Sequence, residues 1–552
     1  MQIDPAAIPA RPAWGRRGAV VSPHGLASEA GLGVLRAGGS AVDAAIATNA
    51  ALAVVAAHSG GLGGDAFWLI WDGTELHGLN GSGRSGAAAT LAAAREALGE
   101  RMPLRGPWTV TVPGAIRSWG DAHARFGRLP WADLLAPAIE LAEGFPATPG
   151  WIEAVERGTS IFGADSDWAR VFRAEGRPWR RGERVAPTHL ARTLRTLAAE
   201  GPDAAYAGPI GRRSADYLAG RGAPVDIEDL ARHTSTWTTP IRAAYRDAVA
   251  TSHPPNSCGP IALELLNILG SLKPPDADAF GGSGVADPRW VHLGLEAARL
   301  ALADRDRLLT DPDAMAPGAI EELLSTDRAA SLAAGIDPDR AAPVIRSDLP
   351  SAGGTVYLAT ADAEGGAVSL IESNYSGFGA GLVDPESGIG FQNRGAFFSL
   401  DPAQVNAMAP GRRTMHTLTP GMLFRDGQPW VVHGSMGGEV QPQVYAQVVS
   451  GLVDGGLDVA TAVAAPRWAA HMDEHLGSPS ISLIEPRYAP AVVAGLRARG
   501  HQVRLASAFD RAMGHAHAIE LIREADEAAP GAPPVAFAAA TDPRSEGAPG
   551  VW

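Results

Sequence analysis

A run of small residues ends at Thr355, and this point divides the chain into two parts of different character. Residues 351–355 read Ser-Ala-Gly-Gly-Thr, and two strands joined by a glycine-rich turn are predicted directly afterwards, over 355–361 and 367–373. Helical patterns dominate residues 85–345, whereas strands and helices alternate after Thr355. Any fold of this chain must therefore accommodate a buried hairpin that begins abruptly after a Pro- and Gly-rich loop.

Thr355 allows two interpretations. It can be an ordinary β-branched residue at the start of a strand, as after many Gly-Thr pairs. It can also be an N-terminal nucleophile, whose hydroxyl attacks the carbonyl of Gly354 so that the chain breaks and Thr355 gains a free amine. Glycine tolerates the strained backbone that such an acyl shift requires. The new amine, with a pKa of about 7.7–8.0, could act as general base for the hydroxyl of the same residue.

A glycine pair, Gly437 and Gly438, follows a second predicted strand and precedes a helix predicted over 441–453. Backbone N–H groups at such a turn form an anion-binding site. In an acyl-transfer enzyme this site is an oxyanion hole, where each donor removed costs about 3–4 kcal/mol. The pair is informative only together with a nucleophile such as Thr355.

Composition excludes several classes of protein. With 552 residues, 46% of them apolar, the chain is globular rather than disordered, collagen-like or coiled-coil. Its formal charge of −14 argues against nucleic acid and anionic membranes as partners, because both require basic surfaces. No run of about 18 apolar residues indicates a transmembrane helix, and residues 1–17 do not have the pattern of a signal peptide. We therefore expect a soluble, cytoplasmic protein.

Other kinds of site find little support in the sequence. The glycine-rich residues 60–65 lack the preceding strand and following helix of a dinucleotide-binding loop, and a tight structural turn is favoured. His515 and His517 could share one face of a strand, which is a weak signal for metal. The single cysteine, Cys258, excludes an internal disulfide and a zinc site built from several cysteines. We expect neither a metal nor an organic cofactor.

Several segments together resemble the gamma-glutamyltransferase (gamma-glutamyltranspeptidase) family of N-terminal nucleophile hydrolases. The matching segments are 38–45, 58–64, 112–114, 254–257, 303–307, 354–355, 434–438 and 542–544. The resemblance implies an α+β fold of four αββα layers and autocleavage between Gly354 and Thr355. The products would be a large subunit, residues 1–354, and a small subunit, residues 355–552, which form one intertwined fold. This heterodimer could itself dimerise, and its partner would be a small-molecule amide substrate.

The resemblance also assigns roles to individual residues. Thr355 matches the nucleophile, and Ser373 matches the hydroxyl residue that hydrogen-bonds and assists it. Gly437 and Gly438 match the glycines of the oxyanion hole. Thr417 matches the second of two serines that contact the substrate carboxylate, and the first of these positions is occupied by His416, which is a further substrate-binding candidate.

Two departures from the family pattern lie at substrate-binding positions before and after the hairpin. The family arginine that holds the substrate α-carboxylate aligns with Ser82, and Arg84 lies two residues further on. The family asparagine that follows the assisting hydroxyl aligns with Tyr375, beside Asn374. Arg84 and Asn374 are therefore candidates for substrate binding.

Two further departures bear on the substrate. The family aspartate that holds the substrate ammonium aligns with Phe397, and a family glutamine aligns with Arg394. A buried ammonium without its carboxylate costs about 3–5 kcal/mol, whereas an added arginine fork suits a carboxylate. We therefore expect an amide that carries an acid but no α-amine, held by Arg394 or Arg84.

Oxamate hydrolysis is the favoured activity, and glutaryl-type cephalosporin acylase activity is also compatible with these residues. The alternative is a true gamma-glutamyl transferase or glutathione hydrolase, in which Asp384 or Asp401 would meet the ammonium. A different class of protein, an unprocessed and non-catalytic binding protein, would retain the fold without cleavage.

Overall fold

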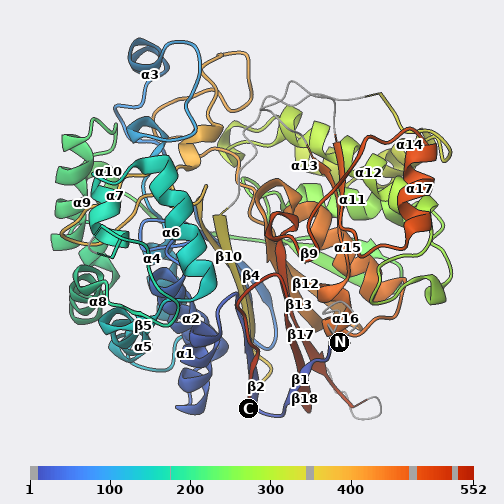
Figure 1. The fold of residues 1–552 in the computed structure, drawn as a ribbon, viewed down its shortest axis with the longest axis horizontal. Helices are drawn as coiled ribbons and strands as arrows, with labels where there is room; N and C mark the ends of the chain where they lie inside the picture. Colours follow the sequence, from blue (N-terminus) through green and yellow to red (C-terminus); the bar gives the residue numbers. More distant parts are fainter. Residues whose placement is uncertain (1–9, 175, 344–353, 472–480, 525–531) are drawn as a thin grey trace.

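The computed structural model describes residues 10–174, 176–343, 354–471, 481–524 and 532–552. Two seven-stranded sheets lie face to face in the middle of the molecule, and helices cover the outer face of each sheet (Figure 1). The prediction of an α+β fold with four αββα layers is confirmed. No helix in these ranges is long and apolar enough to cross a membrane.

The strands of the two large sheets pair antiparallel throughout. The first sheet has the order β1 (Ala13–Gly15), β18 (Ala536–Thr541), β17 (His515–Ile522), β13 (Gln428–Met436), β12 (Pro420–Arg425), β9 (Ala248–Ser252), β8 (Ile241–Tyr245). The second has the order β19 (Gly550–Val551), β2 (Gly18–Val21), β10 (Gly354–Asp362), β11 (Ala367–Tyr375), β3 (Asp65–Trp71), β4 (Leu76–Gly81), β7 (Thr236–Thr238). Two small sheets are formed by β14 (Trp468–His471), β15 (Ile481–Ile484) and β16 (Val503–Leu505), and by β5 (Phe145–Pro146) and β6 (Arg184–Val185).

The helices fall into two groups, one on each side of the paired sheets (Figure 1). The first group, beside the second sheet, is α1 (Gly25–Arg36), α2 (Ala41–Val55), α4 (Ala115–Phe126), α5 (Trp131–Glu143), α6 (Pro149–Phe162), α7 (Asp167–Phe172), α8 (Thr188–Glu200), α9 (Pro209–Gly220) and α10 (Ile227–Ala231), with α3 (Leu91–Leu98) at one end. The other group is α11 (Gly259–Gly270), α12 (Pro288–Leu308), α13 (Ala319–Leu324), α14 (Thr326–Ala334), α15 (Gln441–Val453), α16 (Val459–Ala464) and α17 (Pro490–Ala498).

Strand β11 separates two hydrophobic layers. Val368 and Leu370 pack with the helices of the first group, whereas Ile371 packs between the sheets with Tyr357 and Val432. This alternation follows from the two-residue period of a strand. Because both faces are covered, every residue of β10 and β11 is buried.

The two parts of the chain contribute strands to both large sheets. Strands β1, β8 and β9 of the first sheet, and β2, β3, β4 and β7 of the second, come from before Gly354. The sequence pattern emphasises helices in that part because its strands are short and lie far apart along the chain. Neither part can therefore form a complete sheet without strands of the other.

Candidate active site

Thr355 lies at an irregularity at the start of β10. The pairing between β10 and β11 shifts register between Gly354 and Val356, so that Thr355 occupies a β-bulge. Bulges reorient side chains and are common beside active sites. The Thr355 side chain is directed into the protein, and the residue is 2% exposed.

A chain of hydroxyl groups connects Thr355 to the carbonyl that precedes it. Thr355 Oγ1 donates a hydrogen bond of 3.1 Å to Ser373 Oγ on β11. Ser373 Oγ in turn donates to the carbonyl oxygen of Gly354 at 2.8 Å. A single hydroxyl therefore touches both the candidate nucleophile and the carbonyl that it would attack.

Two N–H donors converge on the same Ser373 oxygen. The backbone N–H of Tyr375 donates at 2.7 Å, and Arg394 Nη2 donates at 3.1 Å. Tyr375 has a φ of 71°, a left-handed conformation that is costly for a non-glycine residue and that concentrates at functional sites. The donors withdraw charge from the Ser373 hydroxyl and strengthen its hydrogen bond to the carbonyl of Gly354.

Arg394 begins the short helix η6 (Arg394–Phe397) and is 1% exposed. Its Nη1 donates to Thr417 Oγ1 at 3.4 Å, and its guanidinium carbon lies 4.7 Å and 5.6 Å from the ring centres of Tyr375 and Phe397. In the described ranges no carboxylate forms an ion pair with Arg394, and its Nε has no hydrogen-bond partner. Burial lowers its pKa to about 10, so it remains a cation at neutral pH.

His416 faces a buried carboxyl group rather than Thr355. Its Nε2 lies 3.1 Å from Asp65 Oδ2, although the two atoms are not aligned as a hydrogen bond. Asp65 Oδ1 accepts the backbone N–H groups of Gly83 and Gly114, both at 3.1 Å. The backbone N–H of His416 donates to the carbonyl of Asn256 at 2.8 Å, which fixes the start of this segment.

Arg84 and Asn374 do not join the cluster around Thr355 and Arg394. Arg84 lies 3.5 Å from Asp311 and 3.9 Å from Asp313, and its side chain is partly exposed. Asn374 directly follows Ser373, so strand alternation places its side chain on the opposite face of β11. There it lines a small cavity beside the glycine-rich loop, with Nδ2 3.5 Å from the carbonyl of Ala57.

The two aspartates considered as ammonium ligands are also engaged elsewhere. Asp384 forms a bidentate ion pair with Arg213, at 2.9 Å and 2.6 Å. Asp401 is exposed and accepts the backbone N–H of Ala403 in its own turn. The position that aligns with the family aspartate is Phe397, an apolar side chain packed against Tyr375 with ring centres 4.5 Å apart.

Gly437 and Gly438 form a turn with a positive φ at both positions, and at Gly437 there is no space for a side chain. Their φ values are 142° and 59°, and a Cβ on Gly437 would lie 2.6 Å from Val440 Cγ2 and 2.9 Å from Gly514 Cα. Gly437 and Thr355 line one cavity of about 650 Å³, within the usual range for ligand sites. The turn and the candidate nucleophile therefore face the same cavity, and the oxyanion-hole role of the two glycines stays a prediction.

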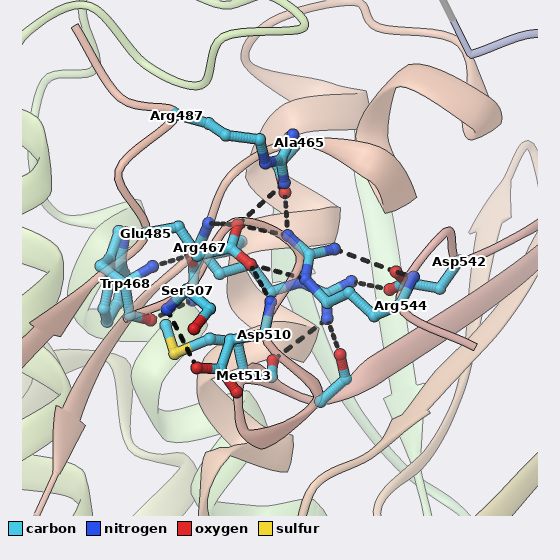
Figure 2. A network of polar contacts seen from close by, with 12 residues as sticks. Ala465, Arg467, Trp468, Glu485, Arg487, Ser507, Asp510, Met513, Asp542 and Arg544 are labelled. Carbon is cyan, nitrogen blue, oxygen red and sulfur yellow. Dashed lines mark hydrogen bonds and ion pairs between the residues drawn. The ribbon is translucent and has the colours of Figure 1, made fainter. Parts of the chain in front are cut away.

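A buried ionic network lies behind the glycine turn and holds the segment at residues 513–516 (Figure 2). Arg467 Nη1 donates to the carbonyl of Met513 at 3.0 Å, and Asp542 accepts the backbone N–H of Ala516 at 2.8 Å. Arg544 links Asp542 to Glu485. The motif at residues 542–544 thus has a structural role, because it holds the segment that packs against Gly437.

Sequence reasoning missed the reason for the glycines between residues 60 and 64. The loop wraps around the buried carboxylate of Glu372, whose two oxygens accept the N–H of Gly61 at 3.0 Å and 3.1 Å. A Cβ on Gly60 or Gly64 would lie only 2.0 Å or 1.9 Å from this carboxylate. The available signal is the one charged residue in the predicted strand 367–373, directly before Ser373.

One cluster in the described ranges has the composition of a metal site, but its atoms are already hydrogen-bonded. His292 Nδ1 and His501 Nε2 lie 2.7 Å apart, and Arg299 donates to Glu296 Oε1 at 2.5 Å. Two nitrogens that share a tetrahedral zinc lie about 3.3 Å apart. The cluster is better described as a hydrogen-bonded network. His517, considered above as a ligand, instead accepts the backbone N–H of Asp542 at 3.2 Å.

The geometry joins Thr355 to Ser373 by a hydrogen bond and places Thr355 and Gly437 on one cavity. Comparisons with known proteins identify the family of the chain. Residues 27–552 match the sequence model described as Gamma-glutamyltranspeptidase. The chain belongs to the gamma-glutamyltranspeptidase family. The resemblance inferred from its motifs is therefore confirmed.

Similar proteins within the gamma-glutamyltranspeptidase family carry different names. The chain is 38% identical over 542 residues to the oxamate amidohydrolase proenzyme of Klebsiella pneumoniae, covering 96% of this chain and 98% of that protein. It is 35% identical over 517 residues to the glutathione hydrolase-like YwrD proenzyme of Bacillus subtilis, covering 92% of this chain and 95% of that protein. A cephalosporin acylase structure from Bacillus halodurans superposes with a TM-score of 0.89 at 36% identity, covering 100% of this chain and 99% of that one.

Proposed function

We propose that this chain is a self-cleaving threonine amidohydrolase that acts on a small amide bearing a carboxylate, with an oxamate-type acid amide favoured. The observation that carries the proposal is Arg394, a buried cation without an ion-pair partner in the described ranges. It is separated from Thr355 by one hydroxyl group, that of Ser373. A buried charge without a counter-ion is costly, and a substrate carboxylate would remove that cost.

The first chemical step is cleavage between Gly354 and Thr355. Thr355 Oγ1 bonds to the carbonyl carbon of Gly354 while its proton passes to Ser373 Oγ, which gives its own proton to the carbonyl oxygen. The C–N bond then breaks, the Thr355 nitrogen takes the proton of the intermediate's hydroxyl, and an ester remains. Water hydrolyses this ester, which leaves a carboxylate on Gly354 and a free amine on Thr355. The fragments are residues 1–354 and 355–552.

Substrate hydrolysis then uses the new amine of Thr355. The amine takes the Oγ1 proton as Oγ1 attacks the amide carbonyl, and it delivers this proton to the leaving nitrogen. The N–H groups of Gly437 and Gly438 donate hydrogen bonds to the developing oxyanion. Water attacks the acyl-threonine and releases the acid. Arg394 and Thr417 hold the substrate carboxylate beside these atoms throughout.

An acid without an α-amine fits this site better than a γ-glutamyl group. Phe397 occupies the aspartate position, and the direct contact of Arg394 with Ser373 favours a short distance between carboxylate and amide. Asp384 and Asp401 do not reach the cluster. The oxamate amidohydrolase relative agrees with a short acid, and the cephalosporin acylase structure agrees with a longer one.

The test compares three substrates on the purified protein: oxamate by ammonia release, and γ-glutamyl and glutaryl p-nitroanilides by colour. Oxamate turnover well above both anilides is the expected result. Preference for the γ-glutamyl anilide would contradict the proposed substrate and would mean that another group holds the ammonium. Denaturing electrophoresis runs in parallel, because a single uncleaved chain without turnover would instead indicate a non-catalytic binding protein.

A further inference from the structure

Three buried polar atoms at and around Arg394 have no hydrogen-bond partner in the described ranges. They are Asp65 Oδ2, Arg394 Nε and His416 Nδ1. Asp65 and His416 face one another at 3.1 Å, and His416 precedes Thr417, which accepts from Arg394. Buried polar groups are normally satisfied, so unsatisfied atoms gathered near the proposed nucleophile are a reason to place a polar ligand there.

The surroundings of the Asp65–His416 pair are mostly apolar or cationic. The ring of Phe67 lies 5.1 Å from that of His416, and the charged groups acting on both members are Arg394 from η6 and Arg413 from the loop before β12. Asp65 in turn raises the pKa of two other titratable groups through space, Glu372 on β11 and Tyr206 after the 3-10 helix Pro202–Ala205.

We propose that Asp65 and His416 form a proton-carrying second half of the carboxylate site, and that the pair takes up a proton when the substrate carboxylate binds beside Arg394. This inference rests on the proposed function of the site. It assigns Asp65 a positioning role, because its carboxyl lies 3.1 Å from Nε2 of His416 and would pair with that nitrogen once the proton is taken up, which leaves Nδ1 for the ligand. His416 then contacts the carboxylate directly as an N–H donor.

Charge balance gives the reason for proton uptake. The empty pair beside two arginines carries a net negative charge when Asp65 is ionised and His416 is neutral. Burial raises the pKa of Asp65 to about 7, so the pair gains or loses one proton near neutral pH. A second carboxylate at 3–6 Å disfavours the negative state and favours the protonated pair. Binding and protonation are therefore coupled, and each must strengthen the other.

The coupling also separates two kinds of ligand. A protonated pair donates hydrogen bonds and offers no free negative charge, so it suits a second carboxylate oxygen rather than an ammonium. The site should therefore bind glutarate better than L-glutamate, although both carry the same distal acid. The opposite order would mean that ionised Asp65 holds an ammonium group.

The test is calorimetric titration of the cleaved wild-type enzyme with oxalate, and separately with glutarate, at pH 7.5 in phosphate and in Tris. The two buffers differ in ionisation enthalpy, so the difference in observed heat reports protons taken up. We expect uptake of roughly half a proton to one proton per ligand, and an inhibition constant that rises up to tenfold per pH unit above about pH 7. Binding without proton uptake would overturn the inference and leave the proposed function intact.

Two variants test whether Asp65 is needed for the proton uptake. Asp65→Asn should abolish the uptake and flatten the pH dependence of KM while kcat keeps its pH profile. His433→Gln is the matched control, because His433 is equally buried on β13 but packs on Tyr445, and it should leave proton uptake unchanged. Uptake that persists in a folded Asp65→Asn enzyme would contradict the assignment. If that variant does not fold, the wild-type titration decides alone. Failure of both dicarboxylates to bind would contradict the acid site itself.

Discussion

The two faces of strand β11 meet different kinds of buried polar group. On the face toward the other sheet, Ser373 contacts Thr355 and Arg394, and the arginine has no ion-pair partner in the described ranges. On the face toward the helices, Glu372 is equally buried, but both of its oxygens accept the N–H of Gly61.

The two surroundings suit different roles, the ligand binding proposed for Arg394 and structural support for Glu372. The carboxylate of Glu372 is enclosed by a loop whose glycines leave no space for any ligand. Two hydroxyl groups and two aromatic rings orient Arg394, and Asp65 acts on it through space without forming an ion pair in the described ranges. Burial alone therefore does not indicate a binding role, and the proposal for Arg394 rests on burial without a directly paired carboxylate.

The strongest test of the sheet-facing side is Thr355→Ala. It should leave one chain of 552 residues on denaturing electrophoresis, because no hydroxyl remains to attack Gly354. Turnover should fall on the order of 10⁴-fold or more. Thr355→Ser is the control, since it retains the hydroxyl and should still yield the two fragments. Cleavage and turnover in the alanine variant would contradict the assignment of the nucleophile.

Removal of the unpaired charge should have the next largest effect. Arg394→Met should raise KM for the acid amide by about 10²–10³-fold, because the substrate carboxylate would be buried without a partner. The KM of Arg394→Lys should lie between those of the wild type and of Arg394→Met, since lysine retains the charge without the fork of the guanidinium. Arg213→Met, which removes an arginine already paired with Asp384, serves as the control and should leave KM unchanged. Equal effects of the two methionine variants would contradict the comparison.

On the helix-facing side, Glu372→Gln should change stability rather than substrate binding. Burial raises the pKa of Glu372 to about 8 from 4.5. Between these values the unfolded chain loses the proton that the folded state keeps, so stability falls as pH rises, by about 1.4 kcal/mol per pH unit. The glutamine variant should lack this decline. Unfolding midpoints of both proteins from pH 5 to pH 8 measure it, and parallel curves would show that Glu372 is ionised in the fold.

Asn374→Ala should have the smallest effect. Because the side chain of Asn374 faces the helices, kcat and KM should stay within about twofold, with a stability loss of about 1 kcal/mol or less. Arg84→Met should behave similarly in KM, since Arg84 pairs with Asp311. A tenfold rise in KM for either variant would place that residue in the substrate site and would weaken the distinction between the two faces.

Much of the local structure was predictable because it depends on nearby residues. The hairpin of β10 and β11 and the helix α15 follow from apolar runs and glycine turns, and α15 has the bounds expected from the pattern. The turn at Gly437 was predictable for the same reason. By contrast, the orientation of Asn374 depends on which face of β11 meets the helices, and a fully buried strand gives no alternation to indicate it.

The remaining features depend on contacts between distant segments. The Asp65–His416 and Glu372–Gly61 contacts join residues more than 300 positions apart, and no spacing rule connects them. The sequence also carried no indication that both large sheets contain strands from before and after Gly354. Family resemblance supplied the residue roles, but it carried Arg84 and Asn374 as binding candidates whose side chains lie outside the Thr355 cluster.

The interleaving of strands has a consequence for the order of events in the life of the protein. Strands β10 and β11 lie between β2 and β3, which come from the other side of Thr355 in the chain. A cut before Thr355 that preceded folding would leave two pieces, each lacking the neighbours of its own strands. Under the proposed mechanism the peptide bond before Thr355 must therefore survive until the sheets are assembled. Only a correctly folded molecule could then release the amine of Thr355, so folding would precede activity in every copy of the chain.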